Sequence, residues 1–330
     1  MTAPTYPGRY LGLRRTDPER LRHTIRLPLT GATPGHPLVA DHLARVPAWN
    51  GATNFHFGTC GPVSVVNSAI QTWKYLLGED IAASDQAIYD LYTRSGNPDF
   101  DPATGADDFG VDMTVMLSAL VKGGIMVQRA SGQTEIVKPL CFAATPTAID
   151  DVRAVTSIFG GALLAVTLQQ AQQAQTGAGL WDYSLSPQWG GHAVLGGSYS
   201  SDMAAHHADE KVVTWMRPVG TTDDFMAHQL DEAYVVVWEP LWDHPAFQDG
   251  VDRAQLAADF AAETGRPFPF PAPLPLPDPM TTHPDRTFGH DQRVIDWATV
   301  TQPSPAVTTS EEQYAAQQYR LWRQARGYAP

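Results

Sequence analysis

A cysteine at the predicted start of a helix constrains this 330-residue chain more than any other feature. It lies in the segment TNFHFGTCGPVSVVNSAI, residues 53–70. Gly58 permits a close backbone approach, Cys60 follows two residues later, and Pro62 fits the first turn of a helix that Gly78 ends. Free backbone N–H groups and the positive end of the helix dipole favour a thiolate there. The same N–H groups are suited to bind an oxyanion, so Cys60 is a candidate nucleophile.

The order of the predicted elements indicates the fold class. Three helical patterns come first, and four runs typical of buried strands follow. The helices are predicted at 63–77, 113–121 and 149–159, and the strands at 161–168, 192–199, 211–215 and 232–238. This order predicts an α+β domain in which a helical lobe precedes a mostly antiparallel sheet.

Proline divides the chain into three parts. Residues 1–45 are predicted to form an extended N-terminal arm, which either lies on another surface or hangs free. Residues 46–240 form the core domain. Residues 241–330 form a proline-rich extension in which the run at 266–279 suits polyproline II, and amphipathic helices are expected at 252–265 and 310–328.

Charge and composition exclude several classes of partner and cofactor. The net charge of −13 argues against nucleic acid and against an anionic membrane surface. No run approaches the roughly 18 apolar residues of a membrane span, and the N-terminus lacks the pattern of a secretory signal, which predicts synthesis in the cytoplasm. Two cysteines, Cys60 and Cys141, cannot build a disulfide framework or a paired-cysteine zinc site. No cofactor and no metal are therefore predicted.

A cysteine nucleophile needs an imidazole base that is distant in sequence and near in space. Among the eleven histidines, His192 directly follows two glycines and opens a predicted strand. His56 precedes Cys60 by four residues and stays open as a substrate contact, whereas His206 and His207 lie in a polar stretch between strands. His192 is the predicted base.

These motifs resemble those of papain-like cysteine peptidases, including the C39-type branch. The resemblance is carried by Gly-x-Cys-Gly-Pro at the start of a long helix and by Gly-Gly-His-Ala-Val on a later strand. More narrowly, the chain is similar to papain-fold proteins of bacteria and their phages. The matching features are Asn54, DDFGVDM at 107–113, VVTW at 212–215 and DEAYVVV at 231–237. The resemblance covers about 50–265 and implies a papain-like fold, with the nucleophile helix packed on the sheet lobe.

The resemblance also implies roles for individual residues. Cys60 would attack a carbonyl carbon, and His192 would act first as base and then as acid. Asn54 would donate to the oxyanion beside the backbone N–H of Cys60; the alternative is that its amide bonds loop backbone. The implied activity is that of a peptidase or amidase on a peptide or cell-wall-type substrate, working through a thioester.

The third catalytic residue departs from the family pattern. Papain-like enzymes usually present Asn or Asp on the strand after the histidine strand, where it orients the imidazole. Here that strand offers Thr214, which could accept one hydrogen bond, and Trp215, which could only shield; Asp209 and Glu210 precede it. A second hypothesis therefore stands beside the enzyme. It is a weak or inactive papain-fold binding protein, for example a phage virion component, whose arms make protein contacts.

Overall fold

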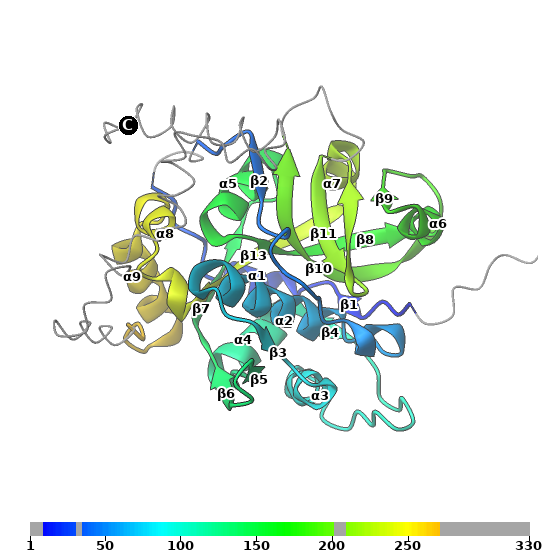
Figure 1. The fold of residues 1–330 in the computed structure, drawn as a ribbon, viewed down its shortest axis with the longest axis horizontal. Helices are drawn as coiled ribbons and strands as arrows, with labels where there is room; N and C mark the ends of the chain where they lie inside the picture. Colours follow the sequence, from blue (N-terminus) through cyan, green and yellow to red (C-terminus); the bar gives the residue numbers. More distant parts are fainter. Residues whose placement is uncertain (1–8, 31–34, 201–208, 271–330) are drawn as a thin grey trace, which may run out of the picture. The chain divides into compact units, whose positions relative to one another are not determined.

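The computed structural model describes residues 9–30, 35–200 and 209–270. Helix α2 (Cys60–Thr72) lies at its centre and continues as a π-helical turn, Trp73–Leu77, which ends at Gly78 with φ of 68°. Every residue of α2 is buried, as expected for a helix that is apolar or small on all sides. Figure 1 shows α2 between the large sheet on one side and α3, α4 and a small sheet on the other.

The helical lobe surrounds α2. Its other elements are α3 (Asp85–Arg94), α4 (Met113–Gly123), and a small antiparallel sheet of β3 (Ile81–Ala82), β5 (Ile125–Arg129) and β6 (Thr134–Val137). Asp112 caps α4 as predicted, because its carboxylate accepts hydrogen bonds from the N–H groups of Thr114 and Val115. Gly124 then ends the helix.

The large sheet has the strand order β7-β13-β8-β10-β11-β12-β9. Its strands are β7 (Pro139–Thr145), β8 (Ala162–Gln169), β9 (Leu180–Trp181), β10 (Gln188–Ser200), β11 (Glu210–Thr214), β12 (Arg217–Thr221) and β13 (Leu230–Trp238). All neighbouring pairs on this path are antiparallel except β12 and β9. The predicted α+β class and all four predicted strands are confirmed.

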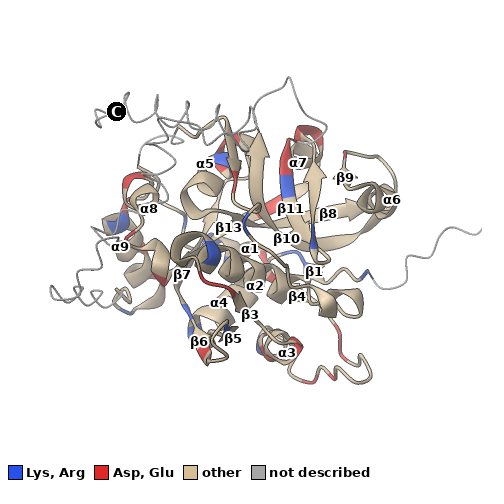
Figure 2. Ribbon diagram, viewed as in Figure 1, with Lys and Arg blue, Asp and Glu red and all other residues tan. Residues whose placement is uncertain are grey.

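Further helices flank this sheet. They are α5 (Ile149–Phe159), α6 (Ala171–Ala178), α7 (Asp223–Gln229), the 3₁₀ turn Glu239–Leu241, α8 (Pro245–Gly250) and α9 (Arg253–Thr264). The predicted bounds of α5 are confirmed, and Asp252 caps α9 as predicted. Acidic residues are spread over α3, α7 and α9 (Figure 2), which matches the negative charge of the chain. The helix predicted at 310–328, most of the run at 266–279, and His206 and His207 lie outside the described residues.

The described part of the N-terminal arm contains regular elements. They are β1 (Leu13–Arg14), α1 (Pro18–Arg22) and β2 (Val39–Asp41). Two short elements outside the arm are the 3₁₀ turn Ala52–Phe55, just before α2, and β4 (Val111–Asp112), just before α4. Strand β1 pairs with two strands at once, antiparallel with β10 and parallel with β4. The arm therefore enters the sheet between the strand of His192 and the segment that precedes α4.

Candidate active site

Cys60 is the first residue of α2, as predicted, but its thiol is covered. The residue is only 1% exposed, and its Sγ accepts a hydrogen bond from the backbone N–H of Ala193 at 3.4 Å. The N–H groups of Gly12 and Gly61 also stabilise the thiolate. Burial outweighs these donors and raises the pKa of Cys60 to about 11. In this state the sulfur is a neutral thiol at pH 7, although the sequence pattern favours a thiolate.

His192 lies on β10, one residue before the amide that contacts the Cys60 sulfur. The residue is fully buried, and its Nε2 lies 2.7 Å from the Oγ1 of Thr214 at the end of β11. Its Nδ1 has no hydrogen-bond partner among the described residues. Burial lowers the pKa of His192 to about 3, so the imidazole is neutral. The fold thus brings the two predicted residues to neighbouring positions on α2 and β10, with one ring nitrogen held and the other available.

Trp215 covers the imidazole from one side. Its ring stacks on His192 with centroids 4.4 Å apart and planes 14° apart. Trp189 stacks on the Trp215 ring, with centroids 5.9 Å apart. Trp215 and Met216 form the tight turn between β11 and β12 with φ of 42° and 65°. Such φ values are costly for bulky side chains, so the stacking contacts offset this strain. The buried Trp215 ring therefore covers one face of the imidazole.

Asp209 and Glu210, the other candidates for orienting His192, do not hydrogen-bond to its imidazole. Asp209 accepts from the backbone N–H of Asp223, and Glu210 accepts from the guanidinium of Arg153 at 2.6 Å. Both are used to tie β11 to α5 and α7. Among the groups considered, only Thr214 bonds to the imidazole.

Asn54 lies in the 3₁₀ turn before α2 and is 1% exposed. Its Nδ2 donates to the carbonyl oxygens of Tyr10 and Phe57, each at 3.0 Å. One of these acceptors is local loop backbone, and the other belongs to the arm. The Asn54 amide therefore bonds backbone in this state, including the loop carbonyl of Phe57 that the alternative interpretation predicts.

Asp108 is a supporting residue to which the sequence reasoning gave no role. Its carboxylate accepts the N–H of Gly58 at 2.9 Å and the hydroxyl of Tyr92 at 2.5 Å, and the Tyr92 oxygen accepts the N–H of Gly110 at 2.7 Å. These bonds fix the loop that delivers Cys60. The available signal was the segment DDFGVDM, which was matched as a pattern without a function for its second aspartate.

The N-terminal arm covers the site at Gly12. The carbonyl oxygen of Gly12 accepts from Val111 at 2.6 Å, and Leu13 pairs with Gly191. A Cβ placed on Gly12 would lie 1.9 Å from the carbonyl oxygen of Gly58, so only glycine fits at this crossing. The arm backbone therefore lies against the loop that leads into Cys60 and donates a hydrogen bond to the Cys60 sulfur.

The arm is anchored beyond this crossing by acidic side chains. Thr16 donates its hydroxyl and its N–H to the carboxylate of Glu232 at 2.7 and 3.0 Å, and Asp17 donates its N–H to Asp112 at 3.3 Å. Arg15 pairs with Asp231 at 2.8 Å. Thr16 and Glu232 are buried, so these charge-assisted bonds contribute more than surface pairs do.

The buried neutral imidazole predicts loss of stability in acid. The folded pKa of His192, about 3, is below the ordinary 6.5, so the stability it contributes is complete above pH 6.5 and is lost as pH falls toward 3. Between pH 6.5 and 5 this amounts to at most about 2 kcal/mol. Urea unfolding at pH 7 and pH 5 should show a smaller pH effect in His192→Gln. His56→Gln, at an exposed histidine, should keep the wild-type difference, and equal pH effects in all three proteins would contradict this assignment.

No family model and no curated protein matches this chain. Solved structures do resemble it. Xylellain, a cysteine protease from Xylella fastidiosa, aligns with a TM-score of 0.50 at 10% identity, over 69% of this chain and 95% of its own. A procathepsin B from Trypanosoma congolense aligns with a TM-score of 0.43 at 12% identity, over 70% and 86%. A digestive procathepsin L 3 from Tenebrio molitor gives 0.43 at 14%, over 65% and 74%. The likeness to xylellain confirms the papain-like fold. In the described ranges, no helix is long and apolar enough to cross a membrane, and no three His, Cys, Asp or Glu side chains group as metal ligands would.

Proposed function

We propose that this chain is a cysteine hydrolase, a peptidase or amidase, that is held in a covered state by its own N-terminal arm. The observation that carries the proposal is the arrangement at His192. Its Nε2 is held by Thr214, its Nδ1 has no hydrogen-bond partner in the described part of the chain, and the next backbone N–H donates to the Cys60 sulfur. A buried Nδ1 without a partner among the described residues also occurs at His42, so the contact of the adjacent N–H with the Cys60 sulfur is what distinguishes His192.

The chemistry follows from these positions once the arm is displaced. Nδ1 of His192 takes the thiol proton, and the Cys60 sulfur attacks a carbonyl carbon. The oxyanion accepts hydrogen bonds from the backbone N–H of Cys60 and from Nδ2 of Asn54, the group that holds the Tyr10 carbonyl in the covered state. The imidazolium then protonates the leaving amine, and water hydrolyses the thioester with His192 as base. The proposed substrate is a peptide or a cell-wall-type amide.

Hydrolysis by an uncovered chain tests this function. Gly12→Asp is expected to displace the arm, because any side chain at this position meets Gly58. In this background, fluorescently labelled casein and peptidoglycan should be assayed at pH 7 with Cys60→Ser and His192→Gln added singly. Cys60→Ser should abolish hydrolysis, and His192→Gln should lower it by about a thousandfold.

Cys141→Ser is the matched control, because Cys141 is equally buried but lies on β7. It should leave hydrolysis unchanged. Labelling with an epoxide-type peptidase inhibitor, read by mass spectrometry, should occur at Cys60 and not at Cys141. Absence of hydrolysis, together with slow and equal alkylation of both cysteines, would contradict the enzyme.

A second candidate is a papain-fold binding protein, for example a virion or particle component. The covered thiol favours it, since a protein that never opens has no use for a reactive cysteine. The two candidates differ in one result: a binding protein would keep Cys60 unreactive even after the arm is displaced.

A further inference from the structure

A cavity of about 350 Å³ lies where α4 and α9 end, and no residue of the candidate active site lines it. Its apolar wall is made by Ile25, Cys141 and Phe260, which are buried, and by the half-buried Phe142 on β7. The apolar surroundings raise the pKa of the Cys141 thiol far above its ordinary value. The volume of the cavity lies at the lower end of the range of small-molecule sites.

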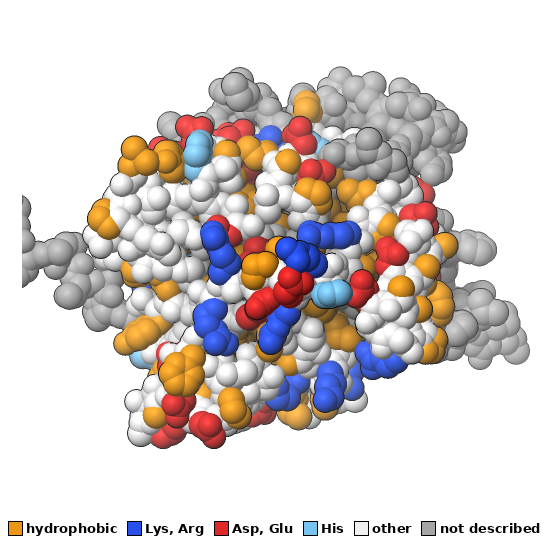
Figure 3. All heavy atoms as spheres, turned by 180° about the vertical axis from the view of Figure 1, so that it is seen from behind, with side chains coloured by type: hydrophobic (Ala, Val, Ile, Leu, Met, Phe, Trp, Pro, Cys, Tyr) orange, Lys and Arg blue, Asp and Glu red, His pale blue; other side chains and the backbone are white. Residues whose placement is uncertain are grey.

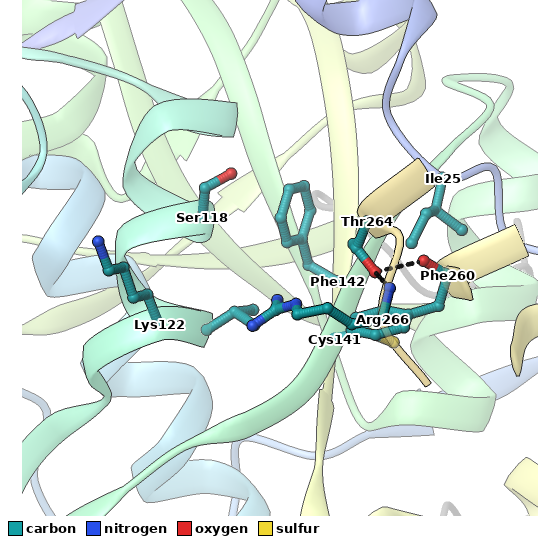
Figure 4. Close-up of a pocket in the computed structure, with 9 residues that line it drawn as sticks. Ile25, Ser118, Lys122, Cys141, Phe142, Phe260, Thr264 and Arg266 are labelled. Carbon is teal, nitrogen blue, oxygen red and sulfur yellow. Dashed lines mark hydrogen bonds between the residues drawn. The ribbon is translucent and has the colours of Figure 1, made fainter. Parts of the chain in front are cut away.

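Two basic side chains stand at the rim of this cavity. Lys122 is in the last turn of α4, and Arg266 follows the end of α9. Figure 4 shows the Arg266 side chain extending across the mouth from the end of α9 toward α4. Its guanidinium carbon lies 5.9 Å from the ring centre of Phe260.

Neither cation pairs with a carboxylate among the described residues, and the residues that line the cavity include no Asp or Glu. Elsewhere, Lys74 pairs with Asp80 at 2.8 Å and Arg129 with Glu135 at 2.8 Å. On the face shown in Figure 3, acidic side chains also stand between the basic ones. In a chain of net charge −13, an apolar cavity lined by two cations and no acidic residue favours an anionic ligand.

We propose that this cavity binds an amphiphilic monocarboxylate, with its apolar body against Phe142 and Phe260 and its carboxylate at Arg266, while Lys122 adds positive charge at the same rim. Apolar burial supplies affinity. Arg266 supplies charge-assisted hydrogen bonds that fix the orientation of the bound molecule, and Lys122 adds electrostatic attraction. The hydroxyls of Ser118 and Thr264 add polar groups to the same rim. The proposal does not depend on Cys60 or on the proposed hydrolase activity.

Calorimetric titration of the full chain with decanoate tests the proposal. One molecule should bind per chain, and decanol, which has the same apolar body without the charge, should bind at least about tenfold more weakly. Lys122→Met combined with Arg266→Met should weaken decanoate binding by about tenfold or more, and should leave decanol binding unchanged. Lys211→Met, at a lysine on β11 outside this lining, should bind decanoate as the wild type does.

A plugged cavity separates pocket binding from general surface adsorption. Ser118→Phe places a ring at the rim from an exposed position, so the fold should be retained, which circular dichroism checks, and decanoate binding should be lost. The proposal is overturned if decanol binds as tightly as decanoate. It is equally overturned if inorganic phosphate matches decanoate, or if the plugged variant still binds.

Discussion

Replacing Gly12 by Asp is expected to raise the rate at which iodoacetamide alkylates Cys60 by about a hundredfold at pH 8. The reason is steric: a Cβ at this position would lie 1.9 Å from the carbonyl oxygen of Gly58, and backbone cannot yield as a flexible side chain does. Overpacking of this kind costs about 1–3 kcal/mol, and every 1.4 kcal/mol raises the open population about tenfold. Alkylation of a buried thiol follows that open population.

The measurement has controls within the same chain. Cys141 provides an internal reference, because its alkylation rate should not change with the arm. Gly35→Asp is the matched substitution, since a Cβ there meets no atom within 4 Å. It should alkylate at the wild-type rate. If Gly12→Asp and Gly35→Asp react equally slowly at Cys60, the arm is not what covers the thiol.

Thr16→Val displaces the arm by a different route. This change removes the hydroxyl that donates to Glu232 while keeping nearly the same shape, and it leaves the loop at Gly58 untouched. Loss of one charge-assisted bond is expected to raise the alkylation of Cys60 by about tenfold. If Thr16→Val raised the alkylation rate of Cys60 more than Gly12→Asp does, the bond between Thr16 and Glu232 would be the main contact that holds the arm in place.

Elements with local signals were predictable from the sequence. Asp112 caps the start of α4, and Gly78 ends the helix that begins at Cys60, both as predicted. Such signals are readable because an N-cap and a left-handed C-terminal glycine act within one turn of the chain. Helix α3 was missed although Ile88, Leu91 and Tyr92 lie on one face and Ser84 caps it. The information that specifies this helix is therefore local to its own sequence.

The cover over the site could not be predicted in the same way. Strand β1 is two residues long, and its partners Val111 and Gly191 lie about 100 and 180 residues away. A strand of two residues has no hydrophobic periodicity. The sequence pattern therefore predicts only an extended arm and does not say whether it lies on a surface or hangs free. The role of Asp108 depends likewise on Gly58, 50 residues earlier. The neutral forms of Cys60 and His192 follow from this long-range burial.

Thr214 is expected to decide whether His192 can act as a base. Its hydroxyl can accept from the Nε2–H of one tautomer or donate to Nε2 of the other. Only the first leaves Nδ1 free to take the thiol proton. A carbonyl oxygen can only accept, and so selects that tautomer. In the Gly12→Asp background, Thr214→Asn should therefore keep or increase hydrolysis at pH 7.

Thr214→Val, by contrast, should lower hydrolysis by about a hundredfold in the same background, because the imidazolium loses its only described acceptor. A hydrogen bond to a charged group contributes about 1.5–3 kcal/mol, which corresponds to roughly one to two pH units. The pH of half-maximal Cys60 alkylation should rise by that amount in the Val variant and not in the Asn variant. A merely structural Thr214 would change the melting temperature and leave the pH profile where it was. The two substitutions therefore distinguish an orienting hydroxyl from a packing one, since both remove the threonine and only one removes the acceptor.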